Sequence, residues 1–262
     1  MTENNQSTVE RTALVGGGAG GIGAATAAAL LAAGHRVVLA GRTGHTLAAT
    51  AAALGGGVDH LVCDLADPAA ATAAVAEVRA RHGSLDVLVV NAGGPAPGRI
   101  LAIADDQWHH NLDLLVLGPL ALLRAALPPM AKRGFGRVVV IGSTAVRQPQ
   151  PGLAASTVLR SAMTAAAKLA AREYAHRGVT VNTVAPGATD TPRRLAVLRA
   201  RARAAGLDLA TAITQDQAEI PAARAADPAE IAAAVAYLAS PAAGYVNGTV
   251  LTVDGGRTEH PG

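Results

Sequence analysis

The chain of 262 residues is half apolar and 16% charged, a composition that excludes intrinsic disorder. Its 29 glycines and 14 prolines follow no strict period, which excludes a collagen-like chain. A formal net charge of +3 and an aromatic content of 2% argue against a nucleic-acid platform built on base stacking.

Short β-branched runs alternate along the chain with longer, alanine-rich amphipathic stretches. The short runs predict seven strands, at residues 12–15, 36–39, 58–62, 87–90, 137–141, 179–184 and 249–253. The longer stretches predict six helices, at residues 22–33, 46–54, 68–82, 105–132, 153–176 and 228–239. This alternation is typical of an α/β fold with a doubly wound parallel sheet and right-handed crossovers.

The chain shows no internal repeat and no linker, so we expect a single domain at residues 11–256. Residues 1–10 are expected to form a disordered N-terminal tail, and residues 257–262 a C-terminal tail. The segment 192–221 fits no strand, and we interpret it as a helical excursion or lid. Its basic residues indicate either a solvated helix face or a lid over an anionic substrate; they are Arg193, Arg194, Arg199, Arg201 and Arg203.

The first expected strand runs into a glycine-rich turn, from Gly16 to Gly23, which leads directly into an expected helix. Glycines allow a tight turn and a close approach to a pyrophosphate, whose charge the helix N-terminus stabilises. A flexible loop between two elements is the alternative interpretation. The order of strand, glycine turn and helix favours a dinucleotide-binding site.

The spacing of the glycines in this turn resembles the nucleotide-binding motif of the short-chain dehydrogenase/reductase family. The residues that carry the resemblance are Gly17, Gly21, Ile22 and Gly23, then Asn91-Ala92-Gly93, Pro186-Gly187 with Thr191, and Asn247-Gly248 through Asp254-Gly255-Gly256. The resemblance extends over residues 11–256. It implies a single-domain, Rossmann-like fold with a seven-stranded parallel sheet.

The resemblance also implies where a nicotinamide dinucleotide would bind. The implied positions are Gly17, Gly21, Ile22 and Gly23 for the pyrophosphate, Asp64 and Leu65 for the adenine, Asn91, Ala92 and Gly93 beside the cofactor, and Pro186, Gly187 and Thr191 for the nicotinamide amide and diphosphate.

The residues after the second expected strand bear on the choice of cofactor. Gly41 stands where an acidic residue would hold a ribose 2′-hydroxyl, and Arg42 follows it. A carboxylate repels a 2′-phosphate, whereas a guanidinium attracts it with paired donors. We therefore expect NADP(H) to be favoured over NAD(H); the alternative is that Arg42 is an ordinary exposed charge at a helix start.

The expected catalytic positions depart from the main branch of the family, which uses an Asn, a Ser and a Tyr-x-x-x-Lys pair. Ser143, after the fifth expected strand, matches the Ser. The Tyr and Lys positions hold Ser156 and Arg160, and the Asn position holds Leu115. The Ser-x-x-x-Arg pattern resembles a divergent branch of the family that is labelled reductase without an assigned substrate.

Ser156 and Arg160 share one face of their expected helix. Ser156 can orient a substrate oxygen, and Arg160 can bind the nicotinamide ribose or a substrate anion. Arginine stays protonated and cannot act as a general base. Pro119 removes the normal helical donor to the Leu115 carbonyl, which indicates either a site for a relay water, as the resemblance implies, or an ordinary kink. No spacing of His, Cys, Asp or Glu indicates a metal site.

These observations predict an NADP(H)-dependent oxidoreductase that moves a hydride between the nicotinamide and a carbonyl or alcohol carbon. Ser143, Ser156 and Arg160 would form its non-standard catalytic site. Two alternatives remain open: a non-redox enzyme on this scaffold, such as a dehydratase, cyclase or isomerase, and a catalytically silent nucleotide-binding protein. Oxidation of the cofactor separates the first hypothesis from the other two.

The expected partners are a small-molecule substrate and further copies of the chain, with no nucleic acid and no membrane. The two longest expected helices have extensive apolar faces, and the family pairs these helices between subunits, so we expect a homotetramer or homodimer. The single cysteine, Cys63, excludes an intrachain disulfide, and residues 1–10 lack the apolar run of a signal peptide. We therefore expect a cytoplasmic protein.

Overall fold

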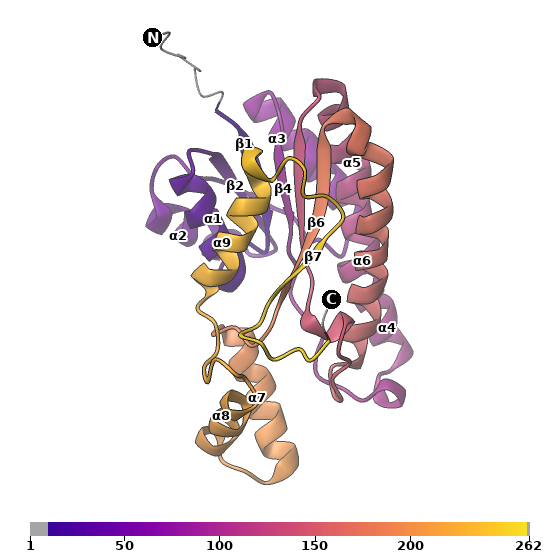
Figure 1. Cartoon of the computed structure of the whole chain (residues 1–262). Helices are drawn as coiled ribbons and strands as arrows, with labels where there is room; N and C mark the ends of the chain where they lie inside the picture. The colour runs from indigo at the N-terminus through magenta and orange to yellow at the C-terminus, as the bar shows by residue number, and fades with distance from the viewer. Residues whose placement is uncertain (1–9, 261–262) are drawn as a thin grey trace, which may run out of the picture.

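Within residues 10–260, which the computed structural model describes, the predicted doubly wound sheet is confirmed (Figure 1). The expected tail at 1–10 lies outside the described residues except for Glu10. Seven strands pair in parallel in the order β3-β2-β1-β4-β5-β6-β7. They are β1 Thr12–Gly16, β2 Arg36–Gly41, β3 Asp59–Val62, β4 Val87–Val90, β5 Gly136–Ile141, β6 Val179–Pro186 and β7 Val250–Val253. The strand order reverses between β1 and β4, where sheets of this kind bind ligands.

Asp-Pro pairs set the start of two of the helices between the strands. Asp67 accepts a hydrogen bond from the Ala69 amide at the start of α3, and Asp227 forms a capping box with Glu230 at the start of α9. The described helices are α1 Gly21–Ala32, α2 Gly44–Leu54, α3 Pro68–His82, α4 Asp105–Leu112, α5 Gly118–Arg133, α6 Ala154–Tyr174, α7 Pro192–Ala205, α8 Leu209–Ala218 and α9 Pro228–Ala239.

The single helix expected at 105–132 is wrong in one respect, because a π-helical turn, η2 (Asp113–Leu117), separates α4 from α5. In this turn the Gly118 amide bonds to the Asp113 carbonyl, five residues back. Pro119 has no N–H for the α-helical bond to Leu115, and the wider turn accommodates its ring. By length and by the composition of its most apolar window, Asp105–Arg133 could cross a membrane, but 61% of that window is buried inside the protein.

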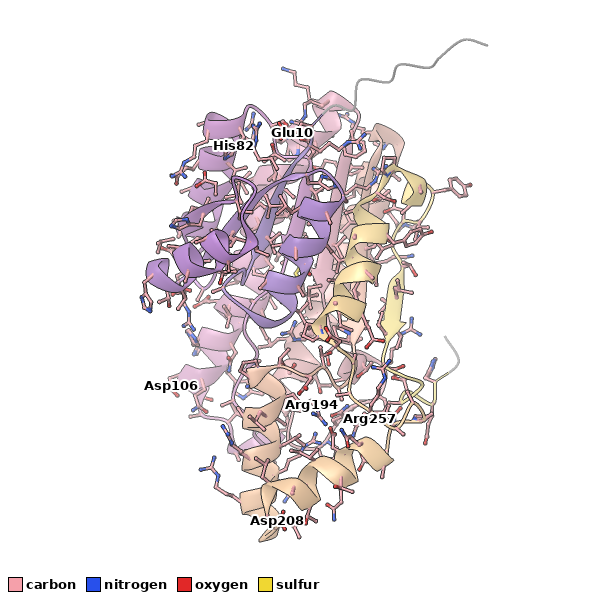
Figure 2. The ribbon with its side chains drawn as sticks, turned by 90° about the vertical axis from the view of Figure 1, so that its left-hand side faces the viewer. Glu10, His82, Asp106, Arg194, Asp208 and Arg257 are labelled. Carbon is pink, nitrogen blue, oxygen red and sulfur yellow. The ribbon has the colours of Figure 1, made fainter. Side chains whose placement is uncertain are left out.

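The segment 192–221 forms the excursion of two helices, α7 and α8, beyond the carboxyl ends of the strands (Figure 1). Asp216 of α8 joins the excursion to the rest of the protein. Its carboxylate accepts bonds from Arg194 Nη2 at 2.8 Å and from Arg257 Nη1 at 2.8 Å, and Arg201 Nη1 lies 3.7 Å away. Figure 2 shows Arg194 and Arg257 converging beneath the sheet. Three segments, α7, α8 and the stretch after β7, therefore meet at one buried carboxylate.

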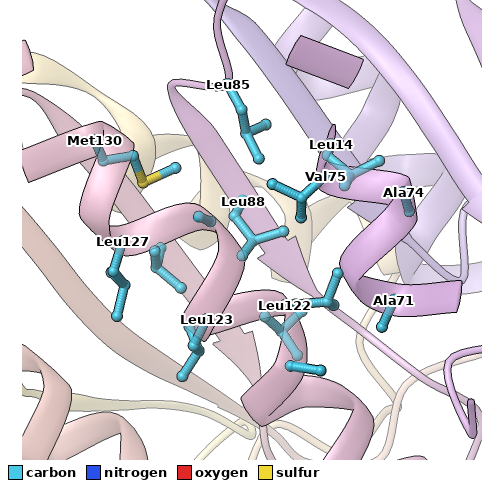
Figure 3. Close-up of a cluster of buried hydrophobic side chains, with 14 of the residues drawn as sticks. Leu14, Ala71, Ala74, Val75, Leu85, Leu88, Leu122, Leu123, Leu127 and Met130 are labelled. Carbon is cyan, nitrogen blue, oxygen red and sulfur yellow. The ribbon is translucent and has the colours of Figure 1, made fainter. Parts of the chain in front are cut away.

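Alternation along the strands divides the core into two layers, because successive side chains point to opposite faces of a sheet. Leu14 packs in the layer of α3, α5 and α6, whereas Val15 packs in the layer of α1, α2 and α9. In the first layer, small side chains of α3 face large ones of α5 (Figure 3). The residues concerned are Ala71, Ala74 and Val75 in α3, and Leu122, Leu123, Leu127 and Met130 in α5. The small side chains allow the two helices to pack closely.

The ion pairs of Asp216 with Arg194, Arg201 and Arg257 predict that the free energy of unfolding depends on pH. Burial alone would raise the pKa of Asp216, but hydrogen bonds from Arg257 and Arg194 outweigh burial and lower it. A lowered pKa stabilises the folded state above the unfolded pKa of about 4, and this contribution is lost as the pH falls through the folded value. We expect Asp216→Asn to lower the free energy of unfolding by about 3 kcal/mol at pH 7.

Urea unfolding of wild type and Asp216→Asn, measured from about pH 7 to pH 3, checks this expectation. The difference in the free energy of unfolding between wild type and Asp216→Asn should shrink as the pH falls below about 4. A difference that is the same at every pH would show that the loss comes from packing and not from charge.

Candidate active site

The carboxyl ends of β1, β4, β5 and β6 open into one cavity of about 590 Å³, and α7 covers its other side. Parallel strands place their carboxyl ends along one edge of a sheet, so residues far apart in sequence meet there. Most of the predicted site residues line this cavity: Gly17, Gly21, Ile22, Asn91, Ala92, Gly93, Ser143, Ser156, Arg160, Pro186, Gly187 and Thr191.

The glycine turn after β1 forms one wall of the cavity. Gly17 and Gly21 have φ angles of +59° and +53°, which side chains disfavour. A Cβ atom at Gly23 would lie 2.1 Å from the Gly17 carbonyl oxygen, so Gly23 does not line the cavity but allows the turn to close. Gly20 precedes α1 without a side-chain cap, and the first turn has no acidic residue. The N–H groups and positive dipole end of α1 are therefore available to an anion.

Asn91 holds the end of β4 against this turn. Its Nδ2 donates to the Gly16 carbonyl oxygen at 3.0 Å, and a Cβ at Gly17 would lie 2.7 Å from the same nitrogen. Gly93, two residues on, has open space where a side chain would be. Asn91 thus supports the turn, while the following backbone borders the cavity.

The opposite wall comes from the end of β6. The Gly187 amide bonds to the Val253 carbonyl at 2.9 Å, and a Cβ at Gly187 would lie 2.6 Å from Asp254 Cβ. Thr191 caps α7 by accepting from the Arg194 amide, and its methyl group lies 3.3 Å from where a Cβ of Gly21 would be. Thr191 therefore links α7 to the glycine turn.

The residues predicted for the adenine end lie outside this cavity. Arg42 and Asp64 are exposed beyond the carboxyl ends of β2 and β3, and Leu65 is buried. The Gly18 amide bonds to the Ala40 carbonyl in β2 at 3.1 Å, so the glycine turn adjoins the end of that strand. Arg42, Asp64 and Leu65 therefore lie along the same carboxyl-terminal edge of the sheet as the cavity, but the Leu65 side chain is part of the core.

Ser143, Ser156 and Arg160 meet in the cavity. Arg160 donates from Nη1 to the Ile141 carbonyl at 2.6 Å and from Nε to Ser156 Oγ at 3.2 Å. Ser143 Oγ accepts from the Ala145 amide at 3.1 Å. Both serine oxygens therefore act as acceptors, and within residues 10–260 neither hydroxyl donates to the protein. Two hydroxyl protons are available to a ligand.

Arg160 remains a cation. Burial, together with the nearby Arg193, lowers the pKa of Arg160 to about 10, which still leaves it protonated at neutral pH. Behind it, Leu115, Pro119 and Arg160 border a small cavity of about 10 Å³. That volume is close to the minimum for one water. The kink at Pro119 takes the form of the π-helical turn.

Arginines of α7 divide between the cavity and the surface. Arg193, Arg194 and Arg201 line the cavity, whereas Arg199 and Arg203 are exposed. Arg194 and Arg201 are two helical turns apart and therefore share one face of α7.

The sequence analysis missed Asp216 and Arg257, which also line the cavity. Arg257 is the first residue of the expected C-terminal tail. No local motif marks either position, because the two meet only through the fold. Among the described residues, no group of three His, Cys, Asp or Glu side chains could hold a metal.

Comparison with known proteins agrees with this geometry. A family model described as enoyl-(acyl carrier protein) reductase matches residues 17–258. The 3-oxoacyl-[acyl-carrier-protein] reductase FabG of Salmonella typhimurium is 32% identical over 251 residues, 94% of this chain and 96% of that protein.

Two solved structures share the fold over nearly the whole chain. A variant of the actinorhodin polyketide ketoreductase with NADPH has a TM-score of 0.92 at 32% identity and covers 96% of this chain and 98% of that one. The L-sorbose reductase of Gluconobacter frateurii, complexed with NADPH and L-sorbose, has a TM-score of 0.89 at 30% identity and covers 96% and 97%. The sequence motifs, the sheet and these relatives together show that the chain belongs to the short-chain dehydrogenase/reductase family.

Proposed function

We propose that this protein is an NADP(H)-dependent reductase of carbonyl compounds, which also oxidises the corresponding alcohols. One observation carries the proposal: the Ser143 and Ser156 hydroxyls, each with a proton to donate, face the same cavity as the glycine turn. Its relatives support it, since two are solved with NADPH and several are named reductases.

The glycine turn fits the pyrophosphate of a dinucleotide, because its backbone leaves room for close approach and the start of α1 offers unpaired N–H groups. Gly93, Gly187 and Thr191 would border the nicotinamide end, and Arg42 would meet the 2′-phosphate. When bound, NADPH would supply the hydride that converts the carbonyl to an alcohol. The cavity of about 590 Å³ is of the size that small-molecule sites require.

Ser143 and Ser156 would hold the substrate oxygen and stabilise the negative charge that develops on it as the carbon is reduced. Arg160 donates to Ser156 Oγ, and a hydroxyl that accepts from a cation is a stronger donor. The same arginine adds positive potential beside the developing alkoxide. Arg160 is therefore a positioning and electrostatic residue in this mechanism.

A serine hydroxyl is too weak an acid to replace a tyrosine phenol as the general acid, and Arg160 already donates to the Ile141 carbonyl and to Ser156 Oγ. The alkoxide would instead take its proton from water that enters through the open cavity. The loss of a positioned general acid costs roughly 10²–10⁴-fold in rate. We expect slow turnover or a substrate with a reactive carbonyl.

Alanine substitutions at the two serines test the proposal. Ser143→Ala and Ser156→Ala should each lower kcat/KM about 100-fold, because each removes one donor to the reacting oxygen. Consumption of NADPH, followed by its absorbance with a panel of ketones, measures the effect. Ser161→Ala is a matched control on α6, since Ser161 bonds to the Thr157 carbonyl and does not line the cavity.

Unchanged activity in both serine variants would refute this placement of the active site. NADPH binding without any oxidation, across the whole panel, would indicate a silent nucleotide-binding protein.

Arg42→Ala tests the choice of cofactor. Wild type should bind NADPH at least about tenfold tighter than NADH, since one charge-assisted contact contributes roughly 1.5–3 kcal/mol. The substitution should remove most of this preference and leave NADH binding unchanged, as measured by calorimetry. Arg79→Ala, an equal change of charge on the exposed end of α3, should leave both affinities unaltered. Equal affinities in wild type would contradict the role of Arg42.

We also propose that the protein works in the cytoplasm as a homotetramer or homodimer. Val158 and Leu169 of α6 are 47% and 61% exposed, and a spacing of eleven residues places them on one helix face. A second copy of α6 would cover both side chains. Light scattering at micromolar concentration should show at least a dimer; a monomer would contradict this assembly.

A further inference from the structure

The charged groups of the cavity are unevenly paired. Five arginines line it, against a single acidic side chain, Asp216. Three of them are within 4.0 Å of that carboxylate: Arg194, Arg201 and Arg257. The other two, Arg160 and Arg193, have no carboxylate within this distance anywhere in residues 10–260. The cavity therefore contains two cations without counter-charges.

Backbone carbonyls hold these two arginines in place. Arg160 bonds to the Ile141 carbonyl, and Arg193 Nη2 bonds to the Pro95 carbonyl. The absence of a side chain at Gly94 makes room for Arg193, since a Cβ there would lie 2.9 Å from its Nε. A guanidinium has five N–H donors, and these bonds leave several of them free on each arginine.

The two guanidinium groups also repel each other. Burial lowers the pKa of both arginines, and Arg193 lowers that of Arg160 further. Arginine stays protonated at neutral pH, so the cavity lining holds two like charges that are partly removed from water. An anion between them would relieve the repulsion and accept the free N–H groups.

We propose that Arg160 and Arg193 bind an anionic oxygen group of the substrate, a carboxylate or a phosphate, next to the carbonyl that Ser143 and Ser156 hold. Arg160 lies one turn from Ser156 on α6, so the anionic group is close to the reacting carbon. The substrate class is then a short oxo acid or a phosphorylated ketone. This inference rests on the proposed function, because it identifies the substrate of the same site.

Matched pairs of probes test the proposal on the enzyme loaded with NADPH. Acetoacetate is compared with methyl acetoacetate, and dihydroxyacetone phosphate with dihydroxyacetone, so that each pair differs mainly in charge. Calorimetry measures binding and NADPH absorbance measures reduction. At least one anion should bind about tenfold or more tightly than its neutral partner, and the pair in which it does identifies the anionic group.

Arg193→Gln should reduce the ratio of the affinities for the anionic and the neutral probe to nearly one. Arg193→Lys should retain part of the preference for the anion, because an ammonium keeps the charge but lacks the planar arrangement of donors. Arg199→Gln, on the exposed side of α7, is the matched control and should retain the full preference. Calorimetry with NADPH alone should give the same affinity for wild type and Arg193→Gln.

Two results would overturn the proposal. One is equal binding of charged and neutral probes in wild type. The other is a loss of NADPH affinity in Arg193→Gln with the preference for the anion intact, which would assign Arg193 to the cofactor. Reduction of neutral ketones without a preference for anions would leave the proposed function standing, whereas tight anion binding without reduction would contradict that function alone.

Discussion

The close approach of Gly23 to the Gly17 carbonyl is the constraint on which the site depends. A single added carbon at Gly23 would lie 2.1 Å from that oxygen, so only glycine lets the chain pass from β1 into α1 at this angle. Asn91 bonds to Gly16 in the same turn and brings the end of β4 against it. The start of α1, the end of β4 and the space between them are therefore positioned together.

A second constraint is the charge of α7. A helix with arginines facing a cavity is tolerated because Asp216 accepts bonds from Arg194 and Arg257 and lies within reach of Arg201. The carboxylate belongs to α8 and one of the donors follows β7, so the excursion and the last strand are joined at this point. The two cavity arginines that Asp216 does not reach are held by other contacts: Arg193 by the Pro95 carbonyl, and Arg160 by the Ile141 carbonyl and Ser156 Oγ.

A third constraint is the pairing of Ser156 with Arg160 on one face of α6. The two residues still face the cavity one turn apart and contact each other at 3.2 Å. Arg160 also bonds to the Ile141 carbonyl at the end of β5, which ties α6 to the strand that carries Ser143. The Ser156 hydroxyl is consequently oriented by a fixed cation, whereas the Ser143 hydroxyl is oriented by the Ala145 amide. In the mechanism that we propose, these contacts would provide orientation and electrostatic stabilisation, and solvent would donate the proton.

The sequence by itself determined the features that depend on near neighbours along the chain. Periodicity located the seven strands, Asp67-Pro68 and Asp227-Pro228 marked two helix starts, and the glycine spacing located the turn after β1. These signals are local, because backbone conformation and capping involve residues only a few positions apart. Most of the predicted site residues accordingly line the cavity, since they lie at the end of a strand, just after it, or at the cap or in the first two turns of a helix.

Only the tertiary structure decided which charged groups meet. Asp216, Arg194 and Arg257 come from three separate segments, and no pattern in the sequence pairs them. Tertiary packing also acts where α5 begins: a Cβ at Gly118 would lie 1.7 Å from the Leu65 carbonyl, so the helix runs against the backbone after β3. Contacts of this kind depend on how distant segments pack, and burial then sets the pKa and the partners of each charge.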